Sequence, residues 1–332
     1  MDYRSLLPGL RDAPVTDGGR AAAPDRRDGA VYVLTEDLVI AVDVALATGR
    51  PLLLRGAPGS GKSSLAAFLA RNLGWRYYEH VVTSRTRARD LLYDYDTVRR
   101  LADASAAKSA IVDDDYVEPA VLWWAFARDS AVRRGAPDGR PAGRPAREPL
   151  ADINEHRSGA GAVVLIDEID KADPDVPNGL LVPLGSTEFE VAETATTVRL
   201  VSPGTGRVPY LIIVTTNEER ELPPAFVRRC IVHELPPPDR ATLIEIGRRH
   251  LAQRAGGVSD ADERLLAMVA DRFAELHQQA TAAGRRAPST AEYLDAVLTC
   301  RAFGVDASSE LWRRMERLVL SKDDAGPSRT TR

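Results

Sequence analysis

A glycine-rich run, GAPGSGKS at Gly56–Ser63, carries the most specific chemistry in the sequence. It fits the pattern G-x-x-x-x-G-K-[ST], a loop whose backbone N–H groups point inward at phosphate oxygens. Lys62 would add a compact ammonium that follows the β- and γ-phosphates, and Ser63 would supply a hydroxyl to Mg²⁺. Only four of the 44 lysine and arginine residues are lysine, so a lysine stands out here. The sequence therefore predicts a nucleotide-phosphate site made of Gly56, Ala57, Pro58, Gly59, Ser60, Gly61, Lys62, Ser63 and Ser64.

Two carboxylates follow a second apolar run, AVVLID, which ends at Asp167. Asp167 is suited to the ligand shell of Mg²⁺, which prefers oxygen ligands. Glu168 comes next and could act as a general base on a water aligned with the γ-phosphate. Alone, the pair could be an ordinary solvated acidic turn, but the phosphate loop upstream favours the chemical roles.

Polar residues also mark the ends of two later apolar runs. Asn217 ends LIIVTTN and could hydrogen-bond the attacking water or the γ-phosphate, although Asn is also a common turn former. Arg228 and Arg229 precede the run IVHEL and could present a guanidinium to a neighbouring subunit, or could be surface charges. The predicted catalytic residues are thus Glu168, Asn217, Arg229 and Arg228, and the predicted metal ligands are Ser63 and Asp167.

These residues need a scaffold of strands that end at one edge. Short apolar runs at 51–57, 77–83, 162–167, 210–216 and 231–235 lack clean alternation, which is typical of parallel strands covered on both faces. Helical patterns lie between several of them, including one over 35–48. The alternation predicts a doubly wound α/β domain, in which ligands bind at the carboxyl ends of the strands.

Composition divides the chain into four parts. Residues 1–29 are predicted to be a loose arm, 30–238 the α/β nucleotide-binding domain, 239–321 a helical domain and 322–332 a disordered tail. Within the α/β domain, 133–160 is rich in Pro, Gly and Arg and is predicted to be a loop insertion, either a disordered surface segment or a partner-contacting loop. The stretch 186–202 is predicted to be a protruding β-hairpin.

The overall charge and hydropathy narrow the class of protein. A net charge of −4 gives no electrostatic reason to expect nucleic acid, and no window is long and apolar enough to span a bilayer. We expect no secretion signal at the N-terminus, and the two cysteines, Cys230 and Cys300, are far apart. We therefore expect a cytoplasmic protein without a membrane partner.

Taken together, these segments resemble an AAA+ ATPase, and most closely the MoxR-like branch. RPLLLRGAPGSGKSSLAAFLA is similar to the Walker A strand, loop and helix, and VVLIDEIDKADPDVPNGLLVPLGSTEFEV to the Walker B segment. IIVTTNEERELPPAFVRRC resembles sensor 1 followed by the arginine-finger turn. The similarity covers roughly residues 34–240, and a helical region follows it as in the family.

The resemblance implies a P-loop αβα sandwich with a parallel five-stranded sheet, a C-terminal helical lid, and ATP with Mg²⁺ as cofactors. It also implies a homo-oligomer, usually a hexameric ring, with the nucleotide between subunits. Asn217 would be sensor 1 and Arg229 the finger, with Arg228 as the second candidate. The family's sensor 2 arginine is missing, because Ser289 or Thr290 stands in its place. Arg285 and Arg286, just upstream, are the candidates to replace it.

Three functions are consistent with these features. The first is an ATPase that remodels a protein client, with a von Willebrand factor A-type partner as in the MoxR-like branch. The second is a nucleotide-gated signalling or defence switch with slow turnover. The third, supported only by Arg85, Arg87, Arg89 and the arginines of 128–147, is a DNA-associated motor.

Overall fold

The computed structural model describes residues 29–106, 111–137, 144–200, 210–305 and 309–320. The arm predicted over 1–29, apart from Gly29, and the tail predicted over 322–332 lie outside these residues. Within the described ranges, no helix combines the length and the apolar composition needed to cross a membrane.

Five parallel strands form the central sheet, in the order β2-β5-β8-β1-β9. They are β1 (Leu52–Arg55), β2 (Trp75–Val81), β5 (Ser158–Asp167), β8 (Tyr210–Thr216) and β9 (Ile231–Glu234). The five apolar runs of the sequence thus coincide with the five strands. β2 and β5 begin earlier than predicted, because Trp75 pairs with Ser158 before a shift in register. The predicted P-loop α/β fold with a parallel five-stranded sheet is confirmed.

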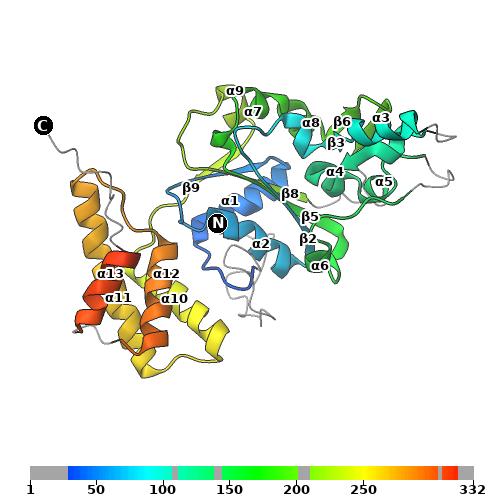
Figure 1. Cartoon of the computed structure of the whole chain (residues 1–332). Coiled ribbons are helices and arrows are strands. Elements are labelled where there is room, and N and C mark those ends of the chain that lie inside the picture. Colours follow the sequence, from blue (N-terminus) through cyan, green and yellow to red (C-terminus); the bar gives the residue numbers. More distant parts are fainter. Residues whose placement is uncertain (1–28, 107–110, 138–143, 201–209, 306–308, 321–332) are drawn as a thin grey trace, which may run out of the picture.

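The two faces of the sheet are covered by different helices, as Figure 1 shows. Leu52 and Leu54 pack against α1 (Glu36–Thr48) and α2 (Lys62–Leu73). Leu53 points to the opposite face, because side chains alternate along a strand. The helices on that face are α4 (Val121–Phe126), α7 (Asp175–Gly179), α8 (Leu181–Ser186) and α9 (Pro224–Val227).

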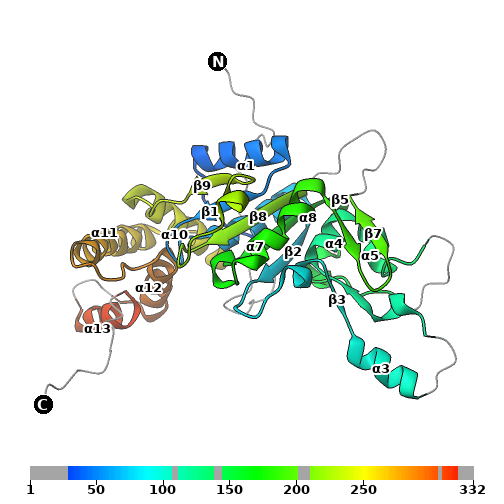
Figure 2. The ribbon, with the colours of Figure 1, turned by 90° about the horizontal axis from the view of Figure 1, so that it is seen from above.

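Two antiparallel strand pairs lie on the second face. One pairs β3 (Tyr93–Tyr95) with β4 (Val117–Pro119), and α3 (Thr97–Ser105) and η2 (Asp113–Tyr116) lie between these strands in the sequence. Figure 2 shows α3 projecting away from the sheet. The other hairpin pairs β6 (Glu188–Val191) with β7 (Thr196–Arg199), where the sequence predicts one. Its Phe189, Val191 and Val198 are buried, so one face packs on the domain instead of protruding.

Four helices form a separate hydrophobic cluster after the α/β domain, seen at the left of Figure 1. They are α10 (Arg240–Ala255), α11 (Asp260–Ala282), α12 (Thr290–Phe303) and α13 (Glu310–Val319). Asp239 caps α10 by accepting a hydrogen bond from the Thr242 N–H at 2.8 Å. A capping box of Ser289 and Glu292 opens α12. We refer to these four helices as the lid.

The prediction that 133–160 is a disordered surface insertion is wrong for the residues described. The segment is preceded by α5 (Arg128–Val132), and it contains α6 (Ala151–Asn154) and the start of β5. Arg134 is 5% exposed and donates to the carbonyls of Val117 and Arg144. One guanidinium thus holds a stretch with few apolar side chains by hydrogen bonds. Residues 138–143 lie outside the described part of the chain.

Asn154 anchors the end of the same segment to the edge strand β2. Its side chain is fully buried, accepts a hydrogen bond from the Tyr77 N–H at 2.8 Å and donates to the Tyr77 carbonyl at 3.0 Å. An edge strand exposes such backbone groups unless something covers them. Asn154 therefore takes the place of a sixth strand at this position.

We predict that Asn154→Ala lowers the free energy of unfolding by about 2–3 kcal/mol, because it leaves both buried backbone groups of Tyr77 unpaired. Urea denaturation with an unchanged slope would measure the difference. Glu155→Ala, at the exposed neighbouring position, is the control and should change stability by less than about 0.5 kcal/mol. Equal stability of the Asn154 variant and the control would contradict the anchoring role.

Candidate functional site

The glycine-rich loop, Gly56–Gly61, turns between β1 and α2. Gly56 (φ 144°), Gly59 (φ 75°) and Gly61 (φ 94°) all have positive φ, which residues with a side chain adopt only at a cost. Gly61 is the N-cap of α2, and no side-chain hydrogen bond caps the helix there. The first backbone amides of α2, at the end of the loop, are therefore not paired by a capping side chain. The backbone thus has the concave form predicted for a phosphate-binding loop.

Lys62 lies inside this loop. It is 5% exposed, and its Nζ donates to the carbonyls of Gly56 at 2.6 Å and Ala57 at 2.9 Å. Burial lowers the pKa of Lys62 below its usual value, although the negative charge of Asp167 and of three other carboxylates acts in the opposite direction. The ammonium therefore occupies the centre of the loop and is held there by main-chain oxygens.

The acid predicted to bind metal lies directly beside the loop. Asp167 is 3% exposed, and its Oδ1 accepts hydrogen bonds from Ser63 Oγ and Thr215 Oγ1, each at 2.6 Å. Ser63 is in the first turn of α2, Asp167 ends β5 and Thr215 lies near the end of β8. The two predicted metal ligands are therefore in direct contact. Sequence reasoning missed Thr215, because only the fold brings β8 beside β5.

Glu168 and Asn217 also meet at this edge of the sheet. Asn217 Nδ2 donates to Glu168 Oε1 at 3.3 Å, and Lys171 Nζ donates to Glu168 Oε2 at 2.6 Å. Glu168 has a left-handed backbone (φ 59°), and its N–H donates to Thr215 Oγ1. The predicted base and the predicted sensor are thus neighbours, and Lys171 is a third member that the sequence analysis did not identify.

Asp170 is a further residue that the sequence analysis missed. It is 2% exposed, and its Oδ2 accepts the backbone N–H groups of Asn217 at 3.2 Å and Glu219 at 2.9 Å. A carboxylate that accepts main-chain N–H groups fixes the path of the loop that donates them. Asp170 therefore sets the position of Asn217, although the two are far apart in the sequence.

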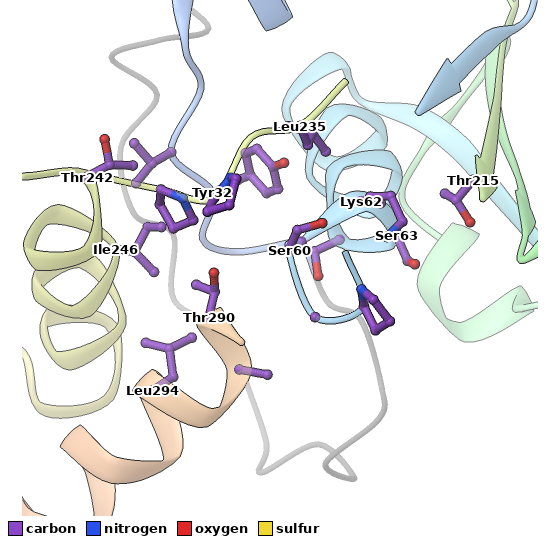
Figure 3. Close-up of a pocket in the computed structure, with 18 of the residues that line it drawn as sticks. Tyr32, Ser60, Lys62, Ser63, Thr215, Leu235, Thr242, Ile246, Thr290 and Leu294 are labelled. Carbon is purple, nitrogen blue, oxygen red and sulfur yellow. The ribbon is translucent and has the colours of Figure 1, made fainter. Parts of the chain in front are cut away.

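A cavity of about 760 Å³ joins these groups to the lid. Lys62, Ser63 and Ser64 line it together with Asp167, Glu168 and Asn217, and so do Pro58, Gly59, Ser60 and Gly61 of the loop. Gly56 and Ala57 do not line it and instead hold the ammonium of Lys62. Figure 3 shows Ile246 and Leu294 of the lid on the side of the cavity opposite Lys62 and Ser63. One end of the cavity is thus polar and charged, and the other is largely apolar.

The lid contributes no lysine or arginine to the described cavity wall, although His250 of α10 lines it. Thr290 and Ala291, in the first turn of α12, line the cavity, and a Cβ placed on Gly59 would lie 2.6 Å from the Cβ of Ser289. Neither Arg285 nor Arg286 lines it, and Arg286 pairs with Glu292 at 3.1 Å. The lid therefore approaches the phosphate loop at the position where the MoxR-like resemblance leads one to expect an arginine.

Arg228 and Arg229 lie away from this cavity. Both are exposed, and their guanidinium groups donate to the carbonyls of Pro224 and Ala225 in their own turn. They precede β9, whose first residue, Ile231, pairs with Leu52 at the amino end of β1. The glycine-rich loop follows the carboxyl end of β1, so the two arginines lie at the opposite end of the sheet.

Comparison with known proteins identifies the family. Residues 51–230 match the AAA domain of the dynein-related subfamily. The chain belongs to this family. Its glycine-rich loop is thus the P-loop of an AAA domain, a class that binds ATP and typically uses Mg²⁺.

Comparison with solved structures and with curated proteins adds less information than the family match does. The AAA chain is similar to the Thermotoga maritima RuvB Holliday junction branch migration motor, with 16% identity and a TM-score of 0.36 over 82% of this chain and 68% of that chain. A mutant of the same motor is similar with 14% identity and a TM-score of 0.41, over 85% and 74% of the two chains. No curated protein matches the sequence.

The residues of this AAA domain fit a magnesium-bound nucleotide. A hydroxyl and a carboxylate in contact supply the oxygen ligands that Mg²⁺ prefers. The positive-φ glycines and the N-terminus of α2 favour an anion at the loop. At the opposite end, the largely apolar wall suits the flat face of a base.

We predict that Lys62→Ala weakens ATP binding by roughly 100-fold or more, because the variant loses charge-assisted hydrogen bonds to phosphate. Titration with a fluorescent ATP analogue would measure the change. Arg313→Ala, an exposed cation of the lid, is the control and should bind as the unmodified chain does. Near-normal affinity of the Lys62 variant would contradict the assignment of the loop.

Proposed function

We propose that this AAA domain is a Mg²⁺-dependent ATPase of the MoxR-like type that couples hydrolysis between subunits to the remodelling of a protein client. The observation that carries the proposal is the 2.6 Å contact between Ser63 Oγ and Asp167 Oδ1, beside the buried ammonium of Lys62. The loop proposed to bind phosphate and the acid proposed to bind the metal thus line one cavity.

Each group at this edge has a role that its chemistry supports. Ser63 and Asp167 would hold Mg²⁺, which when bound neutralises charge on the β- and γ-phosphates. Lys62 would exchange the carbonyls of Gly56 and Ala57 for phosphate oxygens. Glu168 would accept the proton of the attacking water, and Asn217 would orient that water by its amide.

The charge of the cavity supports action between subunits. Among the described residues that line the cavity, Lys62 is the only lysine or arginine. Hydrolysis builds negative charge on the leaving phosphates, so a second cation would stabilise the transition state. Arg229, or Arg228 beside it, is exposed at the far end of the sheet and could reach only the site of another copy. We therefore propose a homo-oligomer, a hexameric ring as in the MoxR-like branch, with nucleotide between subunits.

The nature of the client follows from the resemblance and from the charge of the chain. The MoxR-like branch suggests a protein client and a von Willebrand factor A-type partner, and the net charge of −4 disfavours nucleic acid. Sustained hydrolysis that a protein client stimulates would support remodelling. A single slow turnover with a stable ATP-bound assembly would support a switch, and a steeply salt-dependent affinity for DNA would support a motor.

We predict that Glu168→Gln binds ATP with unchanged affinity but hydrolyses it about 100-fold more slowly or worse, because the amide cannot accept the proton. Phosphate release and equilibrium binding would be measured on the same sample. The matched control is Glu310→Gln, an exposed glutamate of the lid, which should leave both unchanged. Normal turnover by the Glu168 variant would remove its role as the base.

We predict that Arg229→Ala alone is inactive but regains activity when mixed with inactive Glu168→Gln subunits. An Arg229→Ala site keeps its own base and can receive an arginine from its neighbour, so mixed assemblies contain complete sites. The measurement is turnover against mixing ratio, with gel filtration in ATP to follow assembly. Arg228→Ala, treated in the same way, tests the second candidate. Mixtures that show no more activity than the two variants alone would contradict action between subunits.

A further inference from the structure

Lys171 gives the carboxylate of Glu168 a second polar partner. Its Nζ lies 2.6 Å from Glu168 Oε2, while Asn217 Nδ2 lies 3.3 Å from Oε1, so both oxygens accept a hydrogen bond from the protein. Lys171 does not line the cavity that Glu168 and Asn217 line. The ammonium therefore reaches the carboxylate from outside the nucleotide site.

The local backbone fixes this pairing. Glu168 caps η3 (Ile169–Lys171), and the Lys171 N–H donates to the Glu168 carbonyl at 3.0 Å. Side chains three residues apart are eclipsed in a 3₁₀ turn, which brings the two charged groups together. Ile169 is fully buried and Asp170 is 2% exposed, so the turn is anchored to the domain.

Both apolar and acidic groups lie near the pair. On the β2 side, Val81 pairs with Asp167 and lines the cavity with an apolar side chain. The hydrogen bond to Glu168 raises the pKa of Lys171 above its usual value, and the negative charges of Glu168, Glu219 and Asp170 act in the same direction. The pair is partly open to water, with side-chain exposures of 41% for Lys171 and 29% for Glu168. An ion pair of this kind is weak and can be exchanged at small cost.

We propose that Lys171 is a positioning residue that holds Glu168 against Asn217 in the resting AAA domain and so keeps basal hydrolysis low. While the Asn217 amide donates to Glu168, it is not free to orient a water or a phosphate. Neither group can then take up its role until the contact opens. This inference rests on the proposed ATPase function.

The test compares Lys171→Met with Lys171→Arg. Lys171→Met should raise basal kcat by about twofold to fivefold, the range expected from a weak ion pair, and leave KM for ATP unchanged, because Lys171 does not line the cavity. Lys171→Arg, which keeps the cation, should return kcat to the unmodified level. Arg314→Met removes an exposed pair with Glu310 on α13 and is the matched control, with no expected effect. A kcat that is unchanged or lower in Lys171→Met would overturn the proposal.

A second measurement does not depend on hydrolysis. In nucleotide-free protein, amide hydrogen exchange of peptides covering 168–172 and 215–219 should be faster in Lys171→Met and normal in Lys171→Arg. Lys171→Gln should behave as Lys171→Met does, which guards against a folding defect of one variant. Unchanged exchange in both neutral variants would overturn the inference. If the unmodified chain does not hydrolyse ATP in any assembly, the proposed function fails, and the exchange data still test the contact.

Discussion

One carboxylate oxygen, Asp167 Oδ1, joins three elements of the AAA domain. It accepts the hydroxyl of Ser63 from α2 and that of Thr215 from β8, each at 2.6 Å. A charged group that is only 3% exposed is costly unless donors surround it. The phosphate loop therefore cannot shift against the acid without leaving a buried charge unsatisfied. Because Thr215 also accepts the N–H of Glu168, the same junction fixes where the chain turns away from β5.

The lid packs closely against the phosphate loop, and it adds no lysine or arginine to the described wall of the cavity. Gly59 has no room for a side chain, because a Cβ there would meet Ser289 at 2.6 Å. Arg249 of α10 donates to the Tyr32 carbonyl at 3.0 Å and ties the lid to the segment before α1. Arg286, which could have replaced the missing arginine, is paired with Glu292 of the capping box instead. In the proposed ring, the charge on the phosphates would therefore be compensated by Lys62, by bound Mg²⁺ and by an arginine of a neighbouring subunit.

The features that follow from local sequence were predictable, and those that depend on distant partners were not. The P-loop and the five strands each correspond to a short run of consecutive residues. The cap of α10 is equally local, because Asp239 accepts the N–H of Thr242, three residues further along. Arg134 appears in a Pro- and Gly-rich stretch that is typical of disorder, yet its guanidinium is buried against the carbonyl of Val117. Likewise, Asp170 follows the acidic pair as an ordinary turn residue, and the amides that it holds come from the loop after the neighbouring strand β8.

Two adjacent threonines of β8 stabilise the turns after β5 and β8, one threonine for each turn. Glu168 and Glu218 both have a left-handed backbone, with φ of 59° each, a conformation that costs on the order of 1 kcal/mol for a residue with a side chain. Thr215 Oγ1 accepts the N–H of Glu168, and Thr216 Oγ1 accepts the N–H of Glu218, each at 2.9 Å. These bonds offset the strain, and both come from adjacent residues of one buried strand. A rearrangement of the Glu168 backbone must therefore act on the end of β8, the strand that Asn217 follows.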